Sequence, residues 1–199
     1  MTNKRFKFVS LMNIIVAISL LLNVILISNV LSYKNFINEE ITRSIRLIES
    51  DLTNAQEILE EIINFKKVDE LQYRRIYSMF NDFEYGYKHC LYNYYYEFES
   101  EHKDFSEINL LFDMNDYLLK LGKERQLSLY EVKKDNTVMI HLTENEVDNF
   151  KSIYKKNSEY LNVIDKYKVR IHNVKKDNWV KIVEGIYENG IKYLTNEAL

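Results

Sequence analysis

The chain has 199 residues, of which 46% are hydrophobic and 29% are charged, so it is long enough to bury one core. It contains no proline and only four glycines, and this scarcity of turn-forming residues favours long helices. The chain carries −3 overall, and the cations Lys4, Arg5 and Lys7 precede every acidic residue, so the part beyond Tyr33 carries −6. A domain of that sign is a poor nucleic-acid binder. Cys90 is the only cysteine, which excludes an intrachain disulfide, and we expect it to be buried.

An uncharged stretch of 26 residues runs from Phe8 to Tyr33 and is dominated by Ile, Leu and Val. At about 1.5 Å of rise per residue it exceeds the ~30 Å hydrocarbon core of a bilayer, so we expect a spanning helix from Phe8 to about Leu31. Uncharged polar residues interrupt the stretch, among them Asn13, Ser19, Asn23 and Ser28. The two asparagines are either contacts to a partner helix or tolerated polar positions.

A cleaved signal peptide would begin in the same way, with a basic stretch and an apolar run. This run is longer than the roughly 7–15 residues of a signal peptide, and no small-x-small cleavage site follows it, so we favour a signal-anchor. The cations of residues 1–7 predict a cytoplasmic N-terminus, although Lys34, Arg43 and Arg46 on the other flank weaken the contrast. We therefore expect a single-pass protein of the cell membrane, with a cytoplasmic tail (1–7), a transmembrane helix (8–32), a juxtamembrane amphipathic helix (33–66) and a helical extracytoplasmic domain (67–199).

The juxtamembrane stretch has a heptad pattern. Its apolar residues step by 4, 3, 4, 3, 4 and 3, which gives an a/d seam across three repeats: Ile41, Ile45, Ile48, Leu52, Ala55, Leu59 and Ile62. The seam either faces the core of a bundle or forms a self-association seam with a second copy. Nothing between Leu31 and Ile41 breaks a helix, so the spanning segment can continue into this one as a single rod.

Asp69 and Gln72 form a capping box that predicts a second helix after a break at 64–68. One face of this helix holds Ile76, Phe80, Phe83, Tyr87, Leu91, Tyr94 and Phe98, and a second face holds Tyr85, His89, Tyr92 and Tyr96. Two such faces indicate either a helix covered on both sides or one that exposes tyrosines to a ligand or partner. The candidate binding residues are Tyr85, Tyr92, Tyr95 and Tyr96. Gly86 marks a kink or a close helix contact.

The remainder of the chain predicts three more helices. Asp104 and Glu107 can cap a helix that runs up to Gly122, Thr143 and Glu146 form a second capping box, and Asp177 or Asn178 can begin the last helix. Between them, the segments 127–133 and 137–142 flank a turn-forming Lys134-Asp135-Asn136 and are either a small β-hairpin or an irregular connection. We therefore expect a mainly α fold: one transmembrane helix followed by a bundle of about five helices, with a small hairpin near 127–142 left open.

No motif of a known reaction occurs in the chain. The plausible transition-metal ligands lack metal-binding spacing: His89, Cys90, His102, His141 and His172. The acidic cluster formed by Glu97, Glu99, Glu101 and Asp104 is typical of a solvated helix end. We therefore expect no catalytic residue, no metal and no cofactor.

These features favour a membrane-anchored, non-enzymatic interaction or scaffold protein that binds another protein or forms a homo-oligomer. The alternative is an extracytoplasmic ligand-binding module or a cell-envelope enzyme that uses an aromatic groove between helices.

Overall fold

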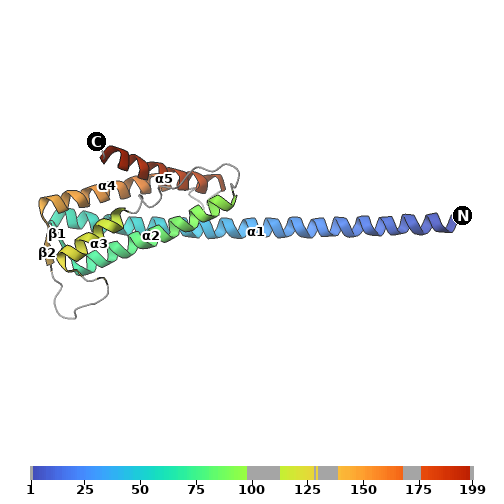
Figure 1. The fold of residues 1–199 in the computed structure, drawn as a ribbon, viewed down its shortest axis with the longest axis horizontal. Helices are drawn as coiled ribbons and strands as arrows, with labels where there is room; N and C mark the ends of the chain where they lie inside the picture. The colour runs from blue at the N-terminus through green and yellow to red at the C-terminus, as the bar shows by residue number, and fades with distance from the viewer. Residues whose placement is uncertain (1, 98–112, 128, 130–138, 168–175, 198–199) are drawn as a thin grey trace. The chain divides into compact units, whose positions relative to one another are not determined.

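A computed structural model describes residues 2–97, 113–127, 129, 139–167 and 176–197 (Figure 1). Five helices and two short strands follow in the order α1 (Thr2–Phe65), β1 (Lys67–Asp69), α2 (Glu70–Glu97), α3 (Asp113–Arg125), β2 (Met139–His141), α4 (Glu144–Tyr167) and α5 (Lys176–Glu197). The chain divides into two compact units, Met1–Glu40 and Ile41–Leu199. The mainly helical fold predicted from the sequence is confirmed.

Helix α1 is continuous through the predicted spanning and juxtamembrane segments, as the absence of helix breakers allowed. It ends at Phe65, and Lys66 adopts a left-handed φ of 52°. This conformation turns the chain into β1 at the break expected for residues 64–68. The first unit therefore consists of the N-terminal part of α1, and the remainder of α1 belongs to the second unit.

Helix α2 begins at the predicted capping box. The Gln72 amide N–H donates to Asp69 Oδ1 at 2.7 Å, and the Asp69 amide N–H donates to Gln72 Oε1 at 3.2 Å. This reciprocal pair satisfies two of the amide groups that a helix start leaves without partners. The described residues of the first predicted face are all buried: Ile76, Phe80, Phe83, Tyr87, Leu91 and Tyr94. Phe98 lies outside the described residues.

Gly86 marks a close contact between helices. A Cβ added there would lie 3.0 Å from Ile48 Cγ1 of α1, so the missing side chain lets α1 and α2 approach. Gly185 likewise lets α5 approach α4, since a Cβ added there would lie 2.7 Å from Val163 Cγ1 of α4. Two of the four glycines thus set helix separations within the second unit.

Helix α3 continues past Gly122, where the sequence predicted its end. It stops at Arg125, and Gln126 takes a φ of 57°. The Leu127 amide N–H donates to the Gly122 carbonyl at 2.9 Å, which is the longer hydrogen bond of a Schellman motif, and Leu127 is buried. The proposed cap at Asp104 and Glu107 lies outside the described residues.

The structure contains a two-stranded antiparallel sheet, and for residues 127–142 the sequence left a hairpin or an irregular connection open. The second predicted segment does contain a strand, β2, but this strand pairs antiparallel with β1, with Val68 opposite Ile140. Leu127 and Leu129 are not in a strand, and residues 128 and 130–138 lie outside the described residues. The pairing therefore joins the α1–α2 junction to the start of α4.

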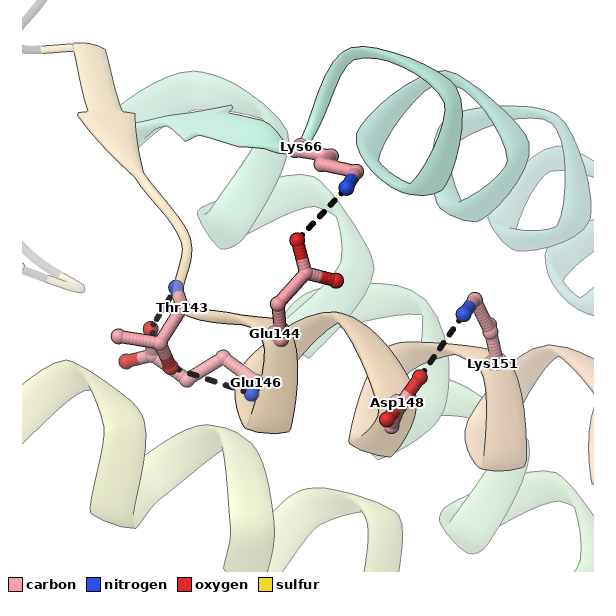
Figure 2. A network of polar contacts seen from close by, with 6 residues as sticks. All are labelled: Lys66, Thr143, Glu144, Glu146, Asp148 and Lys151. Carbon is pink, nitrogen blue, oxygen red and sulfur yellow. Dashed lines mark hydrogen bonds and ion pairs between the residues drawn. The ribbon is translucent and has the colours of Figure 1, made fainter.

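Polar contacts reinforce the same junction (Figure 2). The predicted capping box of α4 is present, because the Thr143 N–H donates to Glu146 Oε2 at 2.7 Å and the Glu146 N–H donates to Thr143 Oγ1 at 3.3 Å. Lys66 Nζ lies 2.7 Å from Glu144 Oε1, and the Leu142 N–H donates to the Lys66 carbonyl at 2.9 Å. Because the Lys66–Glu144 pair is exposed, we expect it to contribute only about 0–1 kcal/mol.

Candidate functional site

The most unusual surface of the chain is the apolar part of α1. Every residue from Met12 to Phe36 is exposed, and Leu21 and Val24 reach 63% and 66%. Such an apolar surface, uncovered all the way around a helix, is unfavourable in water and favourable in the hydrocarbon core of a membrane. Within the described part of the chain, α1 is the one helix long and apolar enough to span a membrane, by length and composition.

The predicted self-association seam lies inside the second unit. Ile41, Ile45, Ile48, Leu52, Ala55, Leu59 and Ile62 each expose 2% or less of their surface. Segments of the same chain cover them, and Asn157 of α4 donates an amide hydrogen to the Leu52 carbonyl at 2.8 Å. These residues are therefore unavailable to a second copy in the folded bundle, and the seam corresponds to the core-facing interpretation.

Helix α2 contacts three other helices through buried aromatic side chains. Tyr73 donates to the Leu118 carbonyl of α3 at 2.9 Å, and Tyr87 donates to the Val183 carbonyl of α5 at 2.7 Å. The ring of Phe83 lies 5.4 Å from that of Tyr160 of α4. Burial raises the pKa of Tyr73 to about 12 and raises the pKa of Tyr87 well above its usual value. Tyr73 and Tyr87 are thus neutral core residues with satisfied hydroxyl groups.

The structure describes the side chains of three of the four candidate binding tyrosines. Tyr85 and Tyr92 point outward, with 69% and 60% of their surface exposed, and lie two helical turns apart on one face of α2. Tyr95 is only partly exposed and packs edge-on against Tyr94, with the ring centroids 6.4 Å apart. Tyr96 belongs to α2, but the structure does not describe its side chain. Tyr85 and Tyr92 thus share one exposed face, and Tyr95, three residues after Tyr92, is less exposed than either.

The exposed tyrosines belong to a longer uncovered face of α2 that sequence reasoning recognised only in part. Its residues step by 4, 3, 4, 3, 4 and 3 and are all exposed: Leu71, Arg75, Ser78, Asp82, Tyr85, His89 and Tyr92. Ser44 Oγ of α1 lies 3.1 Å from His89 Nδ1 at one border of this face. This face could have been predicted from the sequence, because the spacing of its aromatic residues continues from Tyr85 back to Leu71. It was missed because apolar periodicity does not identify the polar residues between them. We call these seven residues the outer face of α2.

Burial also raises the pKa of Asp51 on α1 and of Cys90 on α2. Partial burial, followed by the charge of Asp82, raises the pKa of Asp51. Burial raises the pKa of the Cys90 thiol to about 12, so this cysteine is not a thiolate nucleophile near neutral pH. Among the described residues, no group of three His, Cys, Asp or Glu side chains could hold a metal ion. His102 and His172 lie outside the described residues.

The chain is thus mainly helical, and its described residues contain one candidate membrane-spanning helix and a bundle that has its own core. Its sequence matches no family model and no curated protein, and its fold matches no solved structure.

Proposed function

We propose that the chain is a single-pass, non-enzymatic membrane protein whose second unit lies outside the cytoplasm and acts as a scaffold or assembly partner. The observation that carries this proposal is the uncharged, largely apolar surface of α1 between Met12 and Leu31, in which every residue is exposed. The cations Lys4, Arg5 and Lys7 next to this surface support a cytoplasmic N-terminus.

The position of the core supports different roles for the two units, with the first as the membrane anchor and the second as the folded bundle. The buried apolar residues that the structure describes begin at Ile41 and extend to Tyr187, so they belong to the second unit. Among the residues of the first unit whose side chains the structure describes, none is buried, and the apolar ones from Met12 to Leu31 are exposed to surrounding lipid. An anchor joined to a bundle that has its own core is suited to holding that bundle at a membrane surface.

The outer face of α2 is the surface we propose for the protein partner. Tyr85 and Tyr92 offer large, rigid contact areas at low entropic cost, and Arg75 and Asp82 can provide charge complementarity. The high exposure of Tyr85 and Tyr92 favours an open contact face over an aromatic groove that encloses a small ligand. We therefore place a binding protein ahead of the ligand-binding or enzymatic alternative.

The anchoring part is tested on the full chain in cells. We expect the protein to stay in the membrane pellet after an alkaline carbonate wash, and a C-terminal epitope to be digested by protease added to intact cells. Mass spectrometry of the purified protein checks that residues 1–32 are retained. Recovery in the wash supernatant, or a mature protein without these residues, would overturn the proposal.

The partner surface is tested by site-specific photocrosslinking. We expect a photoreactive residue at Tyr85 or Tyr92 to give a discrete crosslinked product, whereas the same residue at Glu57, an exposed position of α1, gives none. The same product at all three positions would show that the outer face of α2 has no special role.

A further inference from the structure

A second heptad seam lies in the membrane segment itself. Six exposed residues of α1 step by 3, 4, 3, 4 and 3: Asn13, Val16, Leu20, Asn23, Ile27 and Val30. This is the a/d spacing by which two helices supercoil around each other. Asn13 and Asn23 therefore lie on one face of the helix, together with four aliphatic side chains.

The amides of Asn13 and Asn23 are unfavourable in hydrocarbon unless they are hydrogen-bonded. The helix satisfies its own backbone, but each asparagine adds an NH₂ group and a carbonyl oxygen. In the described first unit both side chains are exposed rather than covered by another segment. Lipid tails offer neither donors nor acceptors, so a partner helix is the favourable source of hydrogen bonds for these amides.

A second copy of the chain fits this requirement better than an unrelated helix. Copies inserted with the same orientation place Asn13 opposite Asn13 and Asn23 opposite Asn23, and an amide is both donor and acceptor, so it is complementary to itself. The two amides are ten residues apart, or about 15 Å along the helix, and a different partner would need polar groups at both depths. We infer that the chain forms a parallel homodimer through this membrane seam.

Two further observations agree with this choice of surface. The heptad seam from Ile41 to Ile62 is buried within its own bundle and is closed to a second copy. Asn29, the next amide along α1, follows Asn23 by six residues and so lies about 120° around the helix from it, on the side of Leu22 and Ile25. Asn29 therefore serves as an internal control with the same chemistry and a different face.

The first experiment measures dimerisation of the full chain in detergent micelles by sedimentation equilibrium. We expect the double variant Asn13→Leu/Asn23→Leu to raise the dimer Kd by about tenfold to thirtyfold, as two lost interhelical amide contacts predict. Asn29→Leu should change it by less than about threefold. Leucine is apolar and a good helix former, so neither variant impairs insertion or the helix.

The second experiment maps the face by disulfide crosslinking in phosphatidylcholine vesicles. Single cysteines at Val16, Leu20 and Ile27 should crosslink on oxidation, because facing seam positions bring the two Cα atoms within disulfide range. Single cysteines at Ile18, Leu22 and Ile25, on the opposite face, should not. The unmodified chain gives the background, since its Cys90 is buried.

The inference rests on the proposed anchoring, and vesicle flotation separates their failures. If the chain floats with the vesicles but stays monomeric, the dimer is refuted and the proposed membrane anchoring is retained. A chain that does not float overturns both. Equal effects of Asn29→Leu and Asn13→Leu/Asn23→Leu, or crosslinking that favours the Ile18 face, would also refute the seam.

Discussion

Replacing Gly122 with alanine should destabilise the bundle, although this substitution usually strengthens a helix. In an unconstrained helix interior alanine is more favourable than glycine by about 1 kcal/mol. At Gly122 the added Cβ would overlap the Tyr73 hydroxyl oxygen and lie 2.8 Å from the ring carbon that carries it. Tyr73 is only 1% exposed and its hydroxyl donates to the Leu118 carbonyl at 2.9 Å, so the ring has no free space to enter.

The size of the effect follows from these contacts. Overpacking of a filled core costs about 1–3 kcal/mol, and the loss of the Tyr73 hydrogen bond costs about 1 kcal/mol. With the helix gain subtracted, we expect Gly122→Ala to lower the free energy of unfolding by about 1–3 kcal/mol. Gly86→Ala is the matched control, because its Cβ would meet Ile48 Cγ1 at 3.0 Å and the gain in helix preference is the same. Its net effect should stay within about 1 kcal/mol.

The unfolding of the bundle can be followed without interference from the anchor. Trp179 is the only tryptophan of the chain, is 2% exposed, and packs edge-on against Tyr94 with the ring centroids 6.2 Å apart. Its fluorescence in urea, measured on the full chain in detergent, therefore reports on the second unit alone. In a Tyr73→Phe background the hydroxyl contact is gone, so Gly122→Ala should cost less than it does in the parent. A Gly122→Ala variant as stable as the parent, or strict additivity with Tyr73→Phe, would refute the proposed contact.

Three further outcomes follow from the structure. Cys90, whose pKa burial raises to about 12, should react with a thiol reagent only when urea unfolds the bundle, and fast labelling of the native protein would contradict its burial. The side-chain hydrogen bond from Arg125 lowers the pKa of Glu146 from 4.5 to about 2, so the stability that this carboxylate adds is present above about pH 4.5 and lost as the pH falls toward 2. Glu146→Gln should flatten this part of the stability curve measured by Trp179 fluorescence, and an unchanged slope would count against the ion pair. Tyr87→Phe, which removes a buried hydrogen bond, should cost about 1 kcal/mol of unfolding free energy, whereas Tyr85→Phe at the exposed face should change it by less than about 0.5 kcal/mol.

The features predicted correctly from the sequence are those that depend on neighbouring residues. The capping boxes at Asp69–Gln72 and Thr143–Glu146 need only residues three apart, and both are present. The end of α1 before β1 was predicted in the same way. Helical spacing also grouped the buried residues of α1 and α2 on single faces, because that spacing is fixed by the geometry of the helix itself.

The features that the sequence did not yield depend on contacts between distant segments. The partner of β2 is β1, about seventy residues earlier, and a short apolar strand carries no mark of which edge it will join. Gly122 was interpreted as a helix end because glycine is common there, whereas its use is to admit the Tyr73 ring from another helix. The candidate site has the same limit: spacing places Tyr85 and Tyr92 on one face, but only the packing of the other helices leaves that face uncovered.

The two heptad seams of α1 illustrate how surroundings decide what one pattern does. Residues 41–62 and residues 13–30 share the same spacing, but the first seam is buried in its own bundle, with contacts to Gly86 of α2 and Asn157 of α4, while the second is exposed along its whole length. An aliphatic seam in water is stabilised by any apolar cover, so the nearest helices suffice. A seam in lipid gains nothing from apolar cover alone, and its asparagines then determine whether a partner helix binds and in which register. We therefore expect self-association through the membrane seam of residues 13–30. The amides of Asn13 and Asn23 need hydrogen-bond partners, and a second helix can supply them whereas lipid cannot.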